Sequence, residues 1–220
     1  MLIGLRHRFI FVANTKSAST AIERALEAYA ELHHRGNPAR KHITLARTLE
    51  EYADLFARPG MGAQTFFKFG VMREPMDWIT SWFRYRKRKG ARNPLPPEMS
   101  FEEFWDRHDW NFTRADGQRN LQHRHFTAAD GTVLADVIIP HHRLGEVFPE
   151  ICAHLGVRAE PARRNVSRKP AETVNIPPRL RDELRTFYAE DYALFERLDE
   201  INAAGMERLS CRPVPADTYV

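Results

Sequence analysis

The chain of 220 residues lacks the features that mark several large classes of protein. It has two cysteines, Cys152 and Cys211, and no Cys-x-x-Cys pair, so neither a disulfide framework nor a cysteine zinc site is expected. No apolar run approaches the roughly 20 residues that a membrane-spanning helix needs. The first residues do not form a secretory signal, because their apolar part is short and Arg6 and Arg8 come too late. We therefore expect a cytoplasmic protein that does not enter a membrane.

Glycine is also missing where a nucleotide-binding loop usually needs it. The P-loop requires the pattern G-x-x-x-x-G-K-[ST], but no glycine lies between Gly4 and Gly36. This absence argues against an ordinary kinase or nucleoside triphosphatase. Ala13 and Ala18 partly substitute for glycine, so any phosphate cradle here must have a different backbone.

The composition itself is that of a globular protein, with 43% hydrophobic and 28% charged residues. The length fits one domain over residues 1–220, with a loose tail from about residue 211. The net charge of +4 is weaker than nucleic-acid binders usually carry. The most obvious basic cluster runs from Arg84 to Arg92. It is either a solvated helix end or a patch that faces an anionic ligand.

Hydrophobic periodicity predicts a strand–loop–helix unit near the start of the chain. A buried strand at 9–12 is followed by a polar loop and by a helix that begins near Ser19 or Thr20. Thr20 and Glu23 fit the S/T-x-x-E capping box of a helix N-terminus. The pattern that follows is amphipathic, as expected of a helix that packs on a sheet.

A second unit repeats this logic. A strand at 66–71 leads through Arg73 and Glu74 to Pro75, and proline is favoured at the first position of a helix. An amphipathic stretch at 45–56 predicts a helix between the two units, which would allow a right-handed crossover between parallel strands.

The second half of the chain is more helical. Ser100 and Glu103 form another capping box, and Asp130-Gly131 predicts a tight turn before a strand at 133–139. The clearest amphipathic helix spans 144–155 and ends at Gly156, and further helical patterns follow Pro177-Pro178. The whole pattern predicts a three-layer α/β domain with a mostly parallel central sheet.

The loop after the first strand has the composition of an anion site. It places Lys16 and several hydroxyl groups directly before a helix N-terminus. An anion there would meet unpaired backbone N–H groups and the positive end of the helix dipole, with further donors from Ser17, Ser19 and Thr20. The alternative is that Ser19 and Thr20 only cap the helix.

Arg73 occupies the corresponding position after the second strand. Ligands of open α/β sheets bind at the carboxyl ends of the strands. A guanidinium at that edge can bind a phosphate in a bidentate way, and the hydroxyl of Ser81 can add one hydrogen bond. The alternative is a simple ion pair between Arg73 and the nearby Asp77.

Taken together and in this order, the two segments resemble the sulfotransferases that use 3′-phosphoadenosine 5′-phosphosulfate (PAPS). The resemblance is closest to carbohydrate sulfotransferases of the heparan or uronyl 2-O type and their bacterial relatives. Similar stretches follow at 130–131, 148–156, 165–167 and 188–195, so the resemblance covers nearly all of residues 8–198. It implies the sulfotransferase form of the P-loop-NTPase-like fold, with PAPS as co-substrate and no metal.

The resemblance also implies roles for particular residues. The segment that would bind the 5′-phosphosulfate consists here of Thr15, Lys16, Ser17, Ala18, Ser19 and Thr20. The segment from Arg73 to Ser81 would bind the 3′-phosphate. By the same analogy, a basic loop would cover the 3′-phosphate or the adenine, unless it is only a solvated connection; its residues are Asn165, Ser167, Arg168 and Lys169. This chain departs from its relatives at Arg143, which stands where they carry an acid.

Sulfuryl transfer needs a cation for the leaving oxygen and a base for the acceptor hydroxyl. Lys16 suits the first task, because its ammonium can follow the charge that grows on the leaving nucleotide. His42 resembles the catalytic histidine of the heparan 2-O enzymes, and histidine titrates near neutral pH. Other candidates for the base are a carboxylate or one of four further histidines, His33, His34, His123 and His125.

The sequence thus predicts a sulfotransferase that moves a sulfuryl group from PAPS to a hydroxyl of a carbohydrate or other small polar acceptor. Two alternatives stay open: an atypical nucleotide-dependent kinase, and a non-catalytic binder of polyanions or nucleic acids through the cluster from Arg84 to Arg92. The sequence identifies neither the acceptor nor the oligomeric state, because acceptor pockets are built from variable loops.

Overall fold

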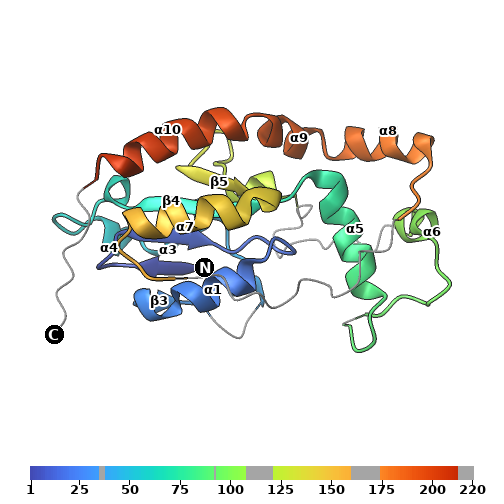
Figure 1. Cartoon of the computed structure of the whole chain (residues 1–220), viewed down its shortest axis with the longest axis horizontal. Helices are drawn as coiled ribbons and strands as arrows, with labels where there is room; N and C mark the ends of the chain where they lie inside the picture. Colours follow the sequence, from blue (N-terminus) through green and yellow to red (C-terminus); the bar gives the residue numbers. More distant parts are fainter. Residues whose placement is uncertain (35–37, 92, 108–120, 160–173, 213–220) are drawn as a thin grey trace.

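The computed structural model describes residues 1–34, 38–91, 93–107, 121–159 and 174–212 (Figure 1). A five-stranded sheet in the order β3-β1-β2-β4-β5 forms its centre. The strands are β1 (Leu2–Gly4), β2 (Phe9–Val12), β3 (Leu32–His33), β4 (Phe67–Met72) and β5 (Val137–Pro140). β2, β4 and β5 are parallel, while β1 is antiparallel to both β2 and β3, so β1 runs against the other four described strands. The predicted α/β fold with a mostly parallel sheet is confirmed.

Helices cover both faces of this sheet, and α8, α9 and α10 follow one another along one long side of the molecule (Figure 1). The helices are α1 (Ser19–Leu26), α2 (Pro38–Lys41), α3 (Leu45–Glu51), α4 (Ala53–Phe56), α5 (Pro75–Arg86), α6 (Phe101–Asp106), α7 (Leu144–His154), α8 (Pro178–Phe187), α9 (Ala189–Glu196) and α10 (Leu198–Ser210). Within the described ranges, no helix is long and apolar enough to cross a membrane.

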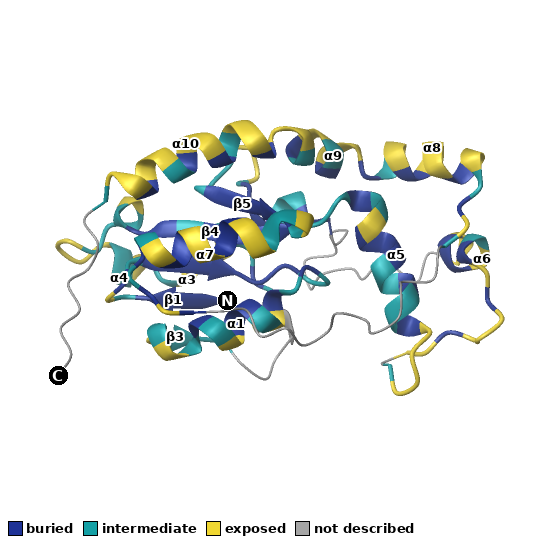
Figure 2. Cartoon of the chain, in the orientation of Figure 1, coloured by how far each residue is buried: buried dark blue, intermediate teal, exposed yellow. Residues whose placement is uncertain are grey.

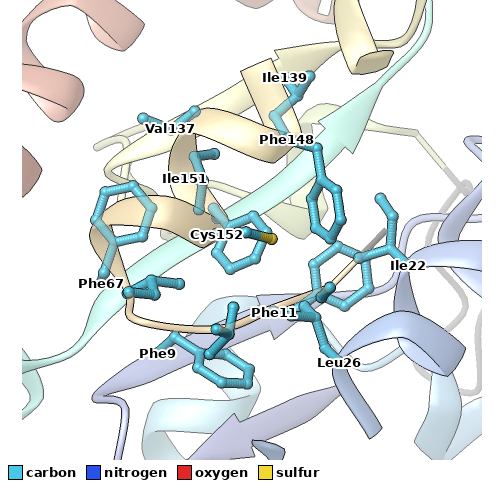
Figure 3. Close-up of a cluster of buried hydrophobic side chains, with 14 of the residues drawn as sticks. Phe9, Phe11, Ile22, Leu26, Phe67, Val137, Ile139, Phe148, Ile151 and Cys152 are labelled. Carbon is cyan, nitrogen blue, oxygen red and sulfur yellow. The ribbon is translucent and has the colours of Figure 1, made fainter. Parts of the chain in front are cut away.

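The alternation of side chains along β2 explains the layers. Phe9 and Phe11 point to the face covered by α1 and α7, where Phe148 packs into the same buried cluster (Figure 3). Ile10 and Val12 point to the opposite face and pack with residues of α3, α9 and α10. Each fully buried side chain of this size contributes about 1.5–3 kcal/mol, so the sheet is held between two apolar layers.

A third apolar cluster lies beyond the sheet and is built from helices alone. Trp78 of α5, Trp105 of α6 and Leu184 of α8 are buried together, with Tyr188 between α8 and α9. The outer face of α8 is exposed, so this helix closes the cluster from one side (Figure 2). The cluster fixes α5 next to the carboxyl end of β4, where the chain leaves the sheet.

Most predicted helix boundaries are confirmed. The Ser100 hydroxyl accepts from Glu103 N at 3.1 Å while the Glu103 carboxylate accepts from Ser100 N at 2.7 Å, which completes the predicted capping box. Pro75 is the first residue of α5, and Gly156 ends the α7 segment with a φ of 65°. The helix predicted at 45–56 is interrupted at Tyr52, where α3 ends and α4 begins.

Candidate functional site

The first loop, residues 13–18, joins β2 to α1 and leaves the N-terminus of that helix uncapped. Ala18 is the N-cap residue, no side chain caps the helix, and no acid lies in its first turn. The predicted capping box of Thr20 and Glu23 is wrong, because α1 begins before Thr20 and Glu23 forms an ion pair with Lys41 at 2.8 Å. The proposal that Ser19 and Thr20 only cap the helix is wrong for the same reason. Unpaired N–H groups and the helix dipole therefore make this end of α1 attractive to an anion.

The backbone of the first loop adopts left-handed conformations without glycine. Lys16 and Ala18 have φ angles of 57° and 60°. This conformation costs a non-glycine residue about 1–2 kcal/mol. The buried Ser17 stabilises the turn by donating its hydroxyl to Asn14 O at 2.8 Å. Strain of this kind is concentrated at functional sites, where the surrounding structure enforces it.

The side chain of Lys16 lies on aromatic rings of α5. Its Nζ is 4.0 Å from the centre of the Tyr85 ring and 5.7 Å from that of Trp82. Burial, with smaller contributions from the charges of Arg88 and Arg73, lowers the pKa of Lys16 to about 8. Among the described residues, no carboxylate forms an ion pair with Lys16. The ammonium is thus held by rings that an incoming anion can replace.

The second loop joins β4 to α5, and its helix is already capped by its own acid. The Glu74 carboxylate accepts from Asp77 N at 2.8 Å and from the Tyr192 hydroxyl at 2.8 Å. The cation of this loop is the partly buried guanidinium of Arg73. Its pKa is lowered by burial, while the charge of Asp77 opposes that shift. Arg73 forms no ion pair with Asp77 in the described structure, so that alternative is wrong.

Arg73 instead contacts a histidine at the carboxyl end of β5. Its Nη2 lies 2.9 Å from His141 Nε2. Burial, together with the charge of Arg73, lowers the pKa of His141 to about 4. His141 is therefore neutral near pH 7 and can accept a hydrogen bond from the guanidinium without repelling it.

The two loops lie side by side at the carboxyl edge of the sheet. The indole N–H of Trp78, on α5, donates to Thr15 O at 2.9 Å. Gln122 Oε1 accepts from Asn14 Nδ2 and from Arg73 N, each at 3.0 Å. The charge of Arg73 also acts on Lys16. Lys16 and Arg73 therefore belong to one positively charged region.

Three buried polar atoms in these loops have no hydrogen-bond partner: Asn14 Oδ1, Thr15 Oγ1 and Arg73 Nε. A buried polar group without a partner costs about 1–3 kcal/mol, and such groups are rare in native proteins. All three come from the two strand ends. Thr15 Oγ1 and Arg73 Nε can donate to a further group, whereas Asn14 Oδ1 can only accept, so this edge of the sheet has unused hydrogen-bonding capacity of both kinds.

His42 lies beside the first loop. Its Nδ1 is 2.7 Å from Ala13 O, and its pKa is lowered by burial. The carbonyl accepts a hydrogen bond only from a protonated Nδ1, so the neutral ring keeps a lone pair on Nε2. No described residue bonds to that Nε2.

Two of the other candidate histidines are engaged elsewhere. Both ring nitrogens of His34 have partners, the Arg40 carbonyl at 3.2 Å and the Tyr52 hydroxyl at 2.6 Å. His123 contacts the buried Asp191 at 2.8 Å. His33 lies in β3 and His125 is buried in the segment after Gln122.

The remaining predicted site residues fall in different places. Ser81 is partly buried in the second turn of α5, one turn after Asp77. Arg143 is at the surface, where it pairs with Glu146 at 2.8 Å and with Asp199 at 3.3 Å. The residues of the predicted covering loop lie outside the described residues; they are Asn165, Ser167, Arg168 and Lys169.

The basic residues at and after the end of α5 differ in what they contact. Arg86 is buried, donating from Nε to Asn93 O at 2.8 Å and lying 5.9 Å from the Phe104 ring centre, so it stabilises the helical cluster. The charge of Arg88 acts on Lys16, and that of Arg84 acts on Arg73. These two arginines add positive potential near Lys16 and Arg73, as a patch that faces an anion would require, whereas Arg86 does not.

Sequence reasoning missed several site residues. Gln122 and His141 reach the loops from distant parts of the chain, and Lys41 donates to the Thr20 hydroxyl at 3.1 Å. His141 carried a usable signal, because it directly follows a parallel strand at the same edge as Arg73. Gln122 lay in no predicted motif, so the sequence did not single it out.

Comparison with known proteins gives one finding. The model of the sulfotransferase family matches residues 1–196. No curated protein and no solved structure gave a significant match. In the described residues, no group of three or more His, Cys, Asp or Glu side chains is arranged to hold a metal ion.

Proposed function

The chain belongs to the sulfotransferase family, and from that premise we propose that it moves a sulfuryl group from PAPS to a hydroxyl of a carbohydrate or another small polar acceptor. The observation that carries the proposal is the pairing of two cationic strand ends, bridged by Gln122 and lined by three unpartnered buried polar atoms. A donor nucleotide with anions at its 5′ and 3′ positions matches the two cations in charge, and its anionic oxygens could accept from Thr15 Oγ1 and Arg73 Nε.

The two ends of the donor are assigned by the difference between the loops. The uncapped N-terminus of α1 and Lys16 favour the 5′-phosphosulfate. The helix N-terminus of the second loop is already occupied by Glu74, so a 3′-phosphate there would depend on the side chains of Arg73 and Ser81.

The reaction then requires two events at this edge of the sheet. The acceptor oxygen bonds to sulfur as the bond between sulfur and the bridging oxygen of the nucleotide breaks, and the ammonium of Lys16 stabilises the charge on that oxygen. The acceptor proton moves to Nε2 of His42, because Nδ1 already donates to Ala13 O and the lowered pKa keeps the ring neutral.

We place this reaction in the cytoplasm. Both cysteines are free, Cys152 in the core and Cys211 at the surface. Free cysteines are typical of a reducing compartment.

The test is a comparison of nucleotides by calorimetry. Wild-type protein is expected to bind adenosine 3′,5′-bisphosphate more tightly than Mg·ATP. Arg73→Met should weaken binding of the bisphosphate by about 10- to 100-fold, since hydrogen bonds to charged groups contribute roughly 1.5–3 kcal/mol. Arg143→Met is the matched control and should leave binding unchanged, because Arg143 pairs with Glu146 at the surface.

Other outcomes would favour the alternatives. Tighter binding of Mg·ATP, with transfer of phosphate, would identify a kinase. Steeply salt-dependent binding of an oligonucleotide, with no preference for the bisphosphate, would identify a polyanion binder. Radiolabelled PAPS with a panel of hydroxyl acceptors measures the transfer itself.

A further inference from the structure

Gln122 lies between the two loops and uses both polar atoms of its side chain to join them. Oε1 accepts from Asn14 Nδ2 and from Arg73 N, each at 3.0 Å, while Nε2 donates to Arg73 O at 2.9 Å. The residue is 0% exposed. Asn14 directly precedes the Thr15-Lys16 turn and also donates to Val71 O at 3.2 Å. One buried amide thus ties the start of the first loop to the backbone of the second.

A buried carboxylate of α9 holds Gln122 in place from the other side. Asp191 is 0% exposed, and its Oδ2 accepts from Gln122 N at 3.0 Å. Its Oδ1 accepts from His123 N at 2.8 Å and lies 2.8 Å from His123 Nδ1. The next residue, Tyr192, donates to Glu74 in the second loop. α9 therefore fixes both Gln122 and the entry to α5.

The approach of this segment to the sheet depends on a glycine in β4. A Cβ added to Gly70 would lie 2.5 Å from Cε1 of the buried Phe126 ring and 2.9 Å from Val12 O. Phe126 therefore packs directly over the strand, three residues after His123. This packing brings the Gln122 turn to the carboxyl end of β4, where Arg73 begins the second loop.

The Gln122 amide does more than fill space in the core. An apolar side chain of similar size would leave Arg73 N and Arg73 O without the partners that Gln122 supplies. What the amide adds is a fixed separation between the loops. A rigid separation favours a ligand that must be bound at both ends, because the loops are ordered before binding.

We infer that Gln122, held by Asp191, is a positioning residue that sets the spacing between the two donor-binding loops. The inference rests on the proposed function, because it assumes one ligand that contacts both loops. A nucleotide with two phosphate ends benefits from the fixed spacing. A nucleotide with one phosphate contacts only one loop, so its affinity does not depend on the spacing.

The experiment compares three probes on Gln122→Leu: adenosine 3′,5′-bisphosphate, 5′-AMP and 3′-AMP. The bisphosphate should bind about 10- to 50-fold more weakly than to wild type, and each monophosphate less than about 3-fold more weakly. In transfer assays the KM for PAPS should rise more than kcat falls. Equal losses for all three probes, or an unchanged bisphosphate affinity, would overturn the inference.

Asn202→Leu is the matched control. Asn202 is another buried amide that bonds a backbone N–H and a carbonyl, those of Ile138 at 2.8 and 2.9 Å, but it lies on α10 away from the loops. Its loss should lower the melting temperature without changing the ratio of the three affinities. If Gln122→Leu does not fold, Asp191→Asn replaces it. We expect it to weaken binding of the bisphosphate more than that of the two monophosphates, by a smaller factor than Gln122→Leu. Equal losses for all three probes again overturn the inference.

Failure of the proposed function gives a different result. Wild-type protein that binds none of the three probes would refute the donor assignment. The positioning role is then tested by hydrogen exchange, because the Arg73 amide donates to Gln122. Faster exchange at Arg73 in Gln122→Leu than in Asn202→Leu supports the role, and equal exchange overturns it.

Discussion

Each of the two loops at the carboxyl edge of the sheet connects a buried parallel strand to a helix. The loops differ in backbone conformation and in how the N-terminus of the helix is capped. The first has two non-glycine residues in left-handed conformations and a helix N-terminus without a side-chain cap. The second has proline at the first helical position, and the Glu74 carboxylate accepts from the helix N–H of Asp77. The first loop thus has a strained backbone and a helix N-terminus without a cap. The second has no left-handed residue, and Glu74 of the loop itself caps its helix.

The difference shows where each loop has capacity to bind. The backbone of the first loop offers free N–H groups, so Lys16 adds to a site that the helix already provides. The second loop has used its helix end internally, and its binding capacity resides in the side chain of Arg73. We therefore expect substitutions in the first loop to affect the chemistry and those in the second to affect mainly affinity.

The largest expected effect follows from Lys16→Met, which removes the ammonium and keeps an apolar stem against Tyr85. Loss of one group that stabilises a developing oxyanion typically lowers kcat by about 10²–10³-fold. We expect a fall of that size with a smaller change in the Kd of adenosine 3′,5′-bisphosphate. Steady-state transfer and calorimetry measure the two quantities. We expect Lys16→Met to change mainly kcat and Arg73→Met to change mainly the Kd. The proposed difference between the loops is wrong if both variants change kcat and Kd in the same ratio.

The pH profile of kcat/KM for the donor provides the next prediction. Lys16 acts when protonated and has a pKa of about 8, so the rate should fall tenfold per pH unit above about pH 8. His42 acts when neutral, and its pKa lies below the ordinary 6.5, so the acid decline should begin below that value. Lys16→Arg should move the basic decline upward, because a guanidinium stays charged. His42→Asn should lower the rate and remove the acid decline.

A basic decline that stays near the ordinary lysine value of 10.5 in wild-type protein would contradict the burial of the ammonium on the rings of Trp82 and Tyr85. The pH dependence of kcat reports the enzyme with donor bound. An anion next to Lys16 should raise the pKa of its ammonium, so the basic decline of kcat should begin at a higher pH than that of kcat/KM.

The parts of the site that could be predicted from sequence are those set by local rules. A buried strand followed by a polar turn and an amphipathic helix places Lys16 at a strand end, and the same rule places Arg73. Pro75 at the start of α5 and the Ser100–Glu103 capping box are equally local. Such features depend on residues within a few positions of one another.

The parts that could not be predicted depend on distant residues. Glu23 has the spacing of a capping box, but it binds Lys41, 18 residues further on, and no local rule distinguishes the two uses. Gln122 meets Asn14 and Arg73 because Phe126 packs over Gly70, a tertiary contact without a sequence signature. Left-handed Lys16 and Ala18 are also unpredictable, because glycine is the usual residue there.

The smallest expected effect tests the strain of the first loop directly. Ala18→Gly should relieve the left-handed cost of about 1–2 kcal/mol and lose about 0.4–1 kcal/mol through greater freedom of the unfolded chain. The net change is a stabilisation of roughly 0–1.6 kcal/mol. Ala21→Gly, three residues later inside α1, should instead destabilise by about 1 kcal/mol, because its backbone is helical. Urea unfolding of both variants measures the difference. A destabilisation at Ala21 without one at Ala18 would locate the strain at Ala18, since the residue types exchanged are identical. Equal destabilisation by the two variants would show that the left-handed backbone at Ala18 is not strained.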